Sequence, residues 1–231
     1  MQIPPVDDIE MLLTALEARR PMVAAHCRRV SGYAVQLAIQ YGLPDDVIEA
    51  IHVGGLLHDL GKLMVPATIL SKPGRLTRRE WRTLQGHPEH GFEMAERLGF
   101  ARAVTDIVLY HHERLDCSGY PDGLTGAAIP WTVRIISVMD AFDAITSPRA
   151  YRAALSVEAA RAMLAREAAG RYCPWVVTGL MSMPRSVLAA VARGDLCGYR
   201  PDTCPGAAAV RSAVTAWRPT FREEPGYLTA W

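Results

Sequence analysis

The stretch Asp45–Lys62, DDVIEAIHVGGLLHDLGK, combines a helical pattern with two residues suited to metal binding. Apolar residues recur three and four positions apart in it, at Val47, Ile48, Ile51 and Leu56. This spacing predicts a helix that ends near Asp59, because Gly61 follows. His58 and Asp59 supply imidazole and carboxylate, the common ligands of hydrolytic metal ions. Since a His-Asp dipeptide is common, its meaning depends on the rest of the chain.

Apolar residues keep a helical spacing through most of the sequence. They predict further helices over residues 8–20, 23–41, 78–85, 88–98, 101–111, 131–146, 156–168 and 174–182. Thr77 and Glu80 form a capping box before one of these helices, and residues 63–76 and 114–130, which contain Gly and Pro, are predicted connections. No stretch alternates apolar and polar residues between hairpin turns. We therefore expect an all-α fold, a bundle of about eight helices.

The length of 231 residues allows one large domain, or one domain with an appendage. Beyond Pro184 the apolar periodicity weakens, although residues 187–191 fit a short helix. We therefore expect one domain over residues 1–183 and a C-terminal appendage of unknown role, partly irregular, over residues 184–231.

The bulk composition excludes several classes of protein. The net charge of +1 gives no electrostatic reason to bind a nucleic-acid polymer. No apolar run reaches the roughly eighteen residues of a membrane span, and the first residues do not resemble a secretory signal. The five cysteines are scattered without a Cys-x-x-Cys pair, which argues against a zinc knuckle or a disulfide framework. Free thiols fit a reducing cytoplasm, where we expect the protein to act.

Several other residues could join His58 and Asp59 in a metal site. A lone histidine in mid-helix, such as His26, is more often a surface or satisfied core residue than a ligand. The pair His111-His112 is a stronger indication of a metal site, because adjacent histidines rarely serve packing. Asp140 lies in an apolar helix and needs a partner, because an unpaired buried charge is costly. That partner could be a metal ion, a backbone group or Arg134.

Five motifs occur together in this helical chain and resemble those of the HD-GYP domain, a subgroup of the HD metal-dependent phosphohydrolase superfamily. They are HCRRV at 26–30, HDLGK at 58–62, HPEHG at 87–91, HHERLDCSGYPDGL at 111–124 and DAFDAITSPRAYR at 140–152. The resemblance runs from about Asp7 to Pro174, and it implies an HD-domain helical bundle.

The resemblance implies a phosphodiesterase that hydrolyses cyclic di-GMP to linear pGpG, and in some members to GMP. The attacking hydroxide would be held between two divalent metal ions, for which iron or manganese suits a mixed His/Asp site. By resemblance, one ion would be bound by His26, His58, Asp59 and Asp140. The other would be bound by Asp59, His87, His111 and His112, so that Asp59 bridges the two.

The resemblance also assigns residues to the reaction and the substrate. Lys62 would lie beside the hydroxide and a phosphate oxygen, and Tyr120 would line the substrate pocket. Arg149 and Arg152 would hold the phosphate that is not cleaved and the guanine side of the ligand, because guanidinium forks match phosphate oxygens.

Four positions depart from the family pattern. Met22 stands where some members have a glutamate that supports a third metal, so we predict two ions. Cys117 replaces a glycine of the Gly-Tyr-Pro loop, which would alter the loop if that glycine needs a positive φ. Ala150 replaces a proline, and Cys173 replaces an aspartate at a late helix start.

Two alternatives to this hydrolase stay open. The first is a catalytically weak HD-GYP signalling module that binds a cyclic dinucleotide or GGDEF-type partners. The second is a hydrolase of another cyclic dinucleotide, because few base-contacting residues are identifiable.

Overall fold

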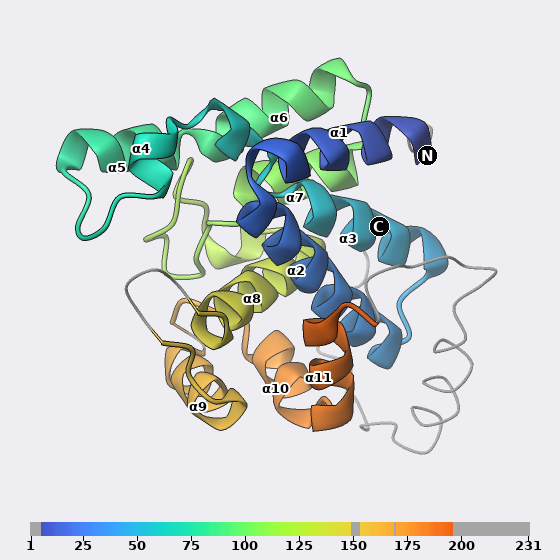
Figure 1. The fold of residues 1–231 in the computed structure, drawn as a ribbon. Coiled ribbons are helices and arrows are strands. Elements are labelled where there is room, and N and C mark those ends of the chain that lie inside the picture. Colours follow the sequence, from blue (N-terminus) through green and yellow to red (C-terminus); the bar gives the residue numbers. More distant parts are fainter. Residues whose placement is uncertain (1–5, 149–152, 169, 196–231) are drawn as a thin grey trace.

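The computed structural model describes residues 6–148, 153–168 and 170–195, with the side chains of residues 6–8 left aside. Within this part of the chain it contains eleven α-helices, two short 3₁₀-helices and no β-strand (Figure 1). The predicted all-α fold is confirmed.

In chain order, the elements are α1 (Val6–Arg19), α2 (Pro21–Gln40), α3 (Asp45–Leu57), η1 (Leu60–Met64), α4 (Ala67–Leu70), α5 (Arg78–Gln85), α6 (His87–Arg97), α7 (Arg102–Tyr110), η2 (Gly126–Ala128), α8 (Trp131–Thr146), α9 (Val157–Glu167), α10 (Pro174–Ser182) and α11 (Arg185–Arg193).

The helix ends follow the local sequence closely. Pro21 occupies the first position of α2, where its missing N–H costs nothing. The capping box predicted before α5 is present, with the side chains of Thr77 and Glu80 each accepting a backbone N–H of the other. The segment 63–76, expected to be a connection, contains the end of η1 and the one-turn helix α4. Helices this short leave no apolar period in the sequence, so the pattern could not reveal them.

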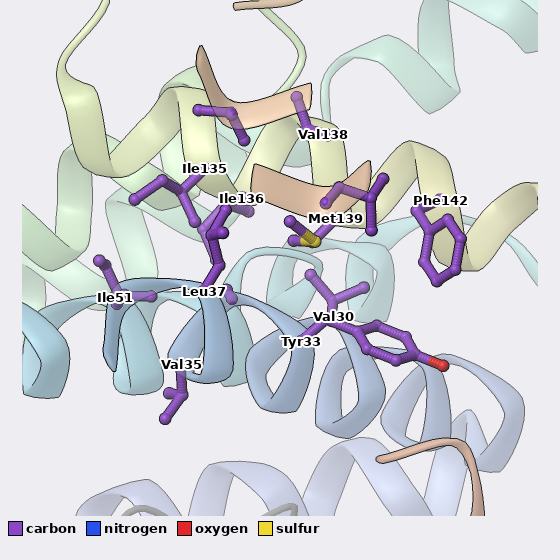
Figure 2. Close-up of a cluster of buried hydrophobic side chains, with 14 of the residues drawn as sticks. Val30, Tyr33, Val35, Leu37, Ile51, Ile135, Ile136, Val138, Met139 and Phe142 are labelled. Atoms are coloured by element: carbon purple, nitrogen blue, oxygen red, sulfur yellow. The ribbon is translucent and has the colours of Figure 1, made fainter. Parts of the chain in front are cut away.

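Helix α2 lies at the centre of the larger hydrophobic core, in contact with α1, α3, α8, α10 and α11. Figure 2 shows Val30 and Leu37 of α2 among Ile51 of α3 and Ile136 and Met139 of α8. All five side chains are fully or almost fully buried, and each such burial contributes about 1.5–3 kcal/mol. This packing fixes the distance between α2 and α8.

A second cluster of buried residues holds the other side of α3. It consists of Leu12, Leu13, Ala50, Val53, Leu56, Leu57, Leu60, Ala95, Phe100, Val104 and Val108. Because α3 contributes Ile51 to the larger core and Leu57 to this one, it is packed on both sides. The C-terminal end of α3, where His58 and Asp59 follow, is therefore held firmly in place.

Helices α9, α10 and α11 lie together at the end of the molecule away from α4, α5 and α6 (Figure 1). Leu188 and Val191 of α11 are buried in the larger core, so this helix packs on the same body as α2. None of the described helices is by itself long and apolar enough to cross a membrane. Helices α10 and α11 reach the necessary length and apolar composition only as a pair, which is bent by 92°.

A glycine allows η1 to approach α6 closely. A Cβ atom at Gly61 would overlap the carbonyl oxygen of His87 and would lie 2.6 Å from the nitrogen of Gly91. These neighbours are backbone atoms, so rotation of a side chain could not make room. The close contact carries Asp59, which precedes η1, toward the start of α6.

The loop after α7 is tied to its own start by a buried carboxylate. Oε1 of Glu113 accepts the backbone N–H groups of Asp122 at 2.8 Å and Gly123 at 2.9 Å, and Oε2 accepts that of Leu124 at 2.9 Å. Hydrogen bonds to a charged acceptor are among the stronger ones in proteins. Glu113 therefore folds the Gly-Tyr-Pro segment back onto the end of α7. The Tyr120–Pro121 peptide bond within it is cis.

Cys117 adopts a backbone conformation that favours glycine. Its φ is +61°, the one positive φ among the described residues other than glycine. The loop thus holds a left-handed residue at this position although a side chain is present. L-residues adopt this conformation at a cost of about 1–2 kcal/mol.

We predict that Gly61→Ala destabilises the protein by about 1–3 kcal/mol, as overpacking of a tight contact does. For a domain of this size each kcal/mol corresponds to a fall in Tm of about 2–4 °C. Gly86→Ala is the matched control, because its Cβ would meet atoms no closer than 3.5 Å. Thermal unfolding of both variants measures the difference, and equal Tm values would contradict the role given to Gly61.

We predict that Cys117→Gly stabilises the protein by about 1 kcal/mol, because it removes the strain of a positive φ. Cys117→Ala removes the exposed thiol but keeps Cβ, so its stability should match that of the original chain. Denaturant unfolding of the three proteins checks this. Equal stabilisation by alanine would show that the thiol, and not the backbone conformation, is the source of the effect.

Candidate metal centre

The structure brings all seven predicted metal ligands together, from positions spread along the sequence. They are His26 in α2, His58 at the end of α3, Asp59 before η1, His87 at the start of α6, His111 and His112 at the end of α7, and Asp140 in α8. The ligand atoms form two groups, in each of which they lie within 4.8 Å of one another. One group is His26, His58 and Asp140, and the other is Asp59, His87, His111 and His112.

The carboxylate of Asp59 lies between the two groups. Its Oδ2 atom is 3.8 Å from Nε2 of His26 and 3.5 Å from Nε2 of His58. Its Oδ1 atom is 3.2 Å from Nε2 of His87 and 3.8 Å from Nε2 of His111. Each oxygen thus faces one group, which is the arrangement that a bridging carboxylate requires.

Three histidines are oriented by backbone carbonyl groups. Nδ1 of His58 donates to Gly55 at 2.8 Å, and Nδ1 of His111 donates to Val108 at 2.9 Å. Nδ1 of His87 likewise donates to the carbonyl of Leu84, at 2.7 Å. A carbonyl only accepts, so the proton of the neutral ring is on Nδ1 and the lone pair is on Nε2. All three Nε2 atoms face Asp59.

His26 is held on both ring nitrogens by α8. Its Nε2 lies 3.1 Å from Oδ1 of Asp140, and its Nδ1 lies 2.7 Å from Oδ2 of Asp143. The alternative pairing of Asp140 with Arg134 is wrong, since that guanidinium donates to the carbonyls of Ile129 and Gly126.

The electrostatics of the cluster favour ionised carboxylates. Burial opposes the charge on Asp59, but Lys62, His58 and His87 outweigh it and hold the pKa of this carboxyl well below its usual range. At Asp140, burial also opposes the charge, but His26 outweighs it and holds the pKa of this carboxyl well below its usual value. Both carboxylates therefore stay charged at neutral pH and are available as ligands.

The histidines fall into two classes. Burial and the neighbouring histidines hold the pKa of His111 well below its usual value, and burial does the same at His112, so both rings are neutral. Burial also disfavours charge on His26 and His58, but the carboxylates beside them raise each pKa to about 9. The group of His26, His58 and Asp140 thus attracts positive charge, be it a proton or a metal ion.

Two buried atoms at the centre have no hydrogen-bond partner among the described residues, namely Nε2 of His58 and Oδ1 of Asp59. Buried polar atoms without partners are rare and costly. Nε2 of His58 belongs to the first group, and Oδ1 of Asp59 faces the second. A cation in each group would therefore satisfy one of these atoms, so the residues present fit a metal site. Cys27, expected to be an ordinary free thiol, also lies within 4.8 Å of ligand atoms of His58 and Asp59.

The predicted catalytic and substrate residues are partly placed. Nζ of Lys62 lies 2.5 Å from Oδ2 of Asp59. The ring of Tyr120 lies over that of His112, with centroids 4.7 Å apart and an interplanar angle of 31°. Burial raises the pKa of Tyr120, so its phenol stays protonated. Arg149 and Arg152 lie outside the described residues.

The two remaining histidines, His52 and His90, lie outside the cluster. Nδ1 of His52 is 2.8 Å from Oγ of Ser31, and burial lowers the pKa of this histidine to about 4. His90 is exposed on α6, three residues after His87.

Sequence reasoning did not single out three residues that shape this centre: Asp143, Arg29 and Glu113. Oδ1 and Oδ2 of Asp143 accept from Nε and Nη2 of Arg29, at 2.7 and 2.9 Å. For two of the three residues the sequence held a signal. Asp143 and Arg29 each follow a predicted ligand by three residues, so each lies on the same helix face as that ligand.

Comparisons with known proteins show the family to which the chain belongs. A sequence model of the HD domain family matches residues 10–176. The cyclic di-GMP phosphodiesterase response regulator RpfG of Xanthomonas campestris is 38% identical over 177 residues, which are 76% of this chain and 47% of that protein. The 3'3'-cGAMP-specific phosphodiesterase 2 of Vibrio cholerae is 37% identical over 172 residues, 74% of this chain and 33% of that protein. The chain thus spans less than half the length of these curated relatives.

Solved structures show the same fold. The cyclic GMP-AMP specific phosphodiesterase V-cGAP3 of V. cholerae has a TM-score of 0.60 at 16% identity and covers 82% of this chain and 53% of that one. The HD domain of the L. monocytogenes phosphodiesterase PgpH has a TM-score of 0.58 at 16% identity, covering 80% of this chain and 98% of that one. With its His-Asp pair, its two groups of ligand atoms and its Gly-Tyr-Pro loop, the chain belongs to the HD domain family and is of the HD-GYP type.

Proposed function

We propose that this chain is a metal-dependent phosphodiesterase that hydrolyses cyclic di-GMP to linear pGpG, with two divalent ions as cofactors. The observation that carries the proposal is the position of Asp59, whose two oxygens each face one group of histidines. A single carboxylate in that position can hold two ions close together.

Two bound ions would activate water, screen the charge of the phosphate and stabilise the in-line transition state. The ligands would be His26, His58, Asp59 and Asp140 for one ion, and Asp59, His87, His111 and His112 for the other. Iron or manganese suits this mixture of imidazole and carboxylate. Met22 is 72% exposed and supplies no oxygen ligand. By the resemblance, a glutamate at this position would support a third metal, so we propose two ions and not three.

The residues around the ligands have separate tasks in this proposal. Lys62 is fixed by Asp59 and places an ammonium group beside the centre, where it can bind a phosphate oxygen. Tyr120 extends the aromatic surface of His112 and offers a face for a base to stack on. Arg149 and Arg152 are proposed, from their motif alone, to bind the second phosphate.

The substrate assignment rests on the motifs and on the relatives. RpfG is named for cyclic di-GMP, and a relative of similar identity is named for 3'3'-cGAMP. Both molecules contain the phosphodiester that the metal centre would cleave, so 3'3'-cGAMP is the alternative substrate. We place the reaction in the cytoplasm, since Cys27, Cys117 and Cys173 are free thiols, and we propose GGDEF-domain proteins as partners.

The test is hydrolysis by protein purified without oxygen and loaded with Fe(II) or Mn(II). Equal amounts of cyclic di-GMP and 3'3'-cGAMP are offered together, and chromatography measures the loss of each. We expect about two ions per chain and faster loss of cyclic di-GMP. Faster loss of 3'3'-cGAMP would correct the substrate, while binding without turnover in the fully loaded protein would show a signalling module.

We predict that Asp59→Asn lowers kcat by about 10³-fold or more, because it removes the shared ligand. His87→Ala and His90→Ala form a matched pair on α6: the first removes a ligand and should lose activity and metal, whereas the second removes an exposed histidine outside the cluster and should change neither. Metal analysis and steady-state kinetics on the same samples check this. Equal metal content in the two histidine variants would contradict the ligand assignment.

A further inference from the structure

His26 differs from the other histidines in what holds its Nδ1 atom. The last four carbonyl groups of a helix have no partner within it, and His58, His87 and His111 use such carbonyls at the ends of α3, α5 and α7. His26 lies at the sixth position of the twenty-residue helix α2, where the nearby carbonyls accept hydrogen bonds of the helix itself. It therefore needs a side-chain acceptor, and Asp143 provides one at 2.7 Å.

Asp143 is itself rigidly held. The guanidinium of Arg29 donates to both carboxylate oxygens, and Oγ of Ser147 lies 3.2 Å from Oδ2. The carboxylate is 1% exposed, and a buried carboxylate without a cation would be costly. Arg29 thus neutralises Asp143 and fixes its plane by two-point hydrogen bonding.

His26, Arg29, Asp140 and Asp143 form a network of polar contacts between α2 and α8. His26 and Arg29 are three residues apart on α2, and Asp140 and Asp143 are three residues apart on α8. Asp140 faces Nε2 of His26, while Asp143 faces Nδ1. One face of α8 thus presents a ligand of the metal centre together with a carboxylate that orients a second ligand.

We propose that Asp143, held by Arg29, is a positioning residue that fixes the ring of His26. It strengthens metal binding at the group of His26, His58 and Asp140 but not at the other group. The inference rests on the proposed function, since it requires a metal ion at the group of His26. A carboxylate behind a ligand histidine directs the lone pair and makes the nitrogen a better donor, and losing it typically costs 10–100-fold in metal affinity. The other group contains no histidine that contacts Asp143.

The competing explanation is that Arg29 and Asp143 only join α2 to α8. In that case their removal would lower stability and leave metal affinity unchanged. The affinities for the two ions, measured separately, distinguish the two explanations.

Three full-length variants test the proposal. Asp143→Asn keeps the size of the side chain but loses the charge, which leaves Arg29 unpaired. The double variant Arg29→Gln with Asp143→Asn removes both charges, so it leaves no buried unpaired ion and stays folded if the single variant does not. Asp106→Asn is the matched control, because it breaks the pair of Arg102 and Asp106 on α7, outside the cluster.

The first measurement is titration with Mn(II), with free Mn(II) followed by electron paramagnetic resonance. We expect two ions in the original chain and in Asp106→Asn. In the two Asp143 variants, one of the two ions should bind about 10–100-fold more weakly while the other is unchanged. The second measurement is NMR of the zinc-loaded, ¹⁵N-histidine-labelled protein. The proton on Nδ1 of His26 should be shifted downfield and protected from exchange. In both variants the amide oxygen of asparagine can still accept this proton, but the acceptor is neutral, so the signal should move upfield.

Unchanged affinity for both ions in folded Asp143 variants, with the His26 signal at its original position, would overturn the role of Asp143 and leave the proposed function standing. An original chain that binds fewer than two ions would overturn both. Equal weakening of the two ions would also overturn the proposal, because the effect would not be confined to the His26 group.

Discussion

The buried carboxylate of Asp59 is the group on which the arrangement of helices around the centre depends. It is 1% exposed and faces histidines from α2, α3, α6 and α7. An anion at that depth is stable only if surrounding groups compensate its charge. The two hydrophobic cores on either side of α3, and the close approach of η1 to α6 at Gly61, hold those groups in place.

The sequence predicted the helices well where their apolar period was long and their ends carried recognisable signals. The capping box of Thr77 and Glu80 marked the start of α5, and Pro21 marked that of α2. Helix α4 was missed because four residues show no period, and α11 proved longer than residues 187–191. How the helices pack was not readable, because the contact between α2 and α8 joins residues that lie far apart in the sequence.

The seven ligand candidates were identifiable because their motifs occur together, and the structure brings them together in two neighbouring groups. That these residues bind metal stays a prediction. Asp143, Arg29 and Glu113 were not singled out, although all three lie inside the quoted motifs. Their roles depend on which atom of a neighbour they face, and a motif does not show that. The bonds of Glu113 to three amides of the following loop emerge only once the loop has folded back.

The directions of the helices add to the field at the centre. Helices α3 and α7 end at His58 and His111, so their C-terminal ends, which carry partial negative charge, point toward the same place as the carboxylates of Asp59 and Asp140. An unpaired anion is disfavoured there and a cation is favoured. The neutral rings of His111 and His112 add lone pairs without adding positive charge. The start of α6 at His87 brings a partial positive charge to the same centre. The cation preference therefore comes from the two carboxylates and the ends of α3 and α7, and the ammonium group of Lys62 already lies beside Asp59.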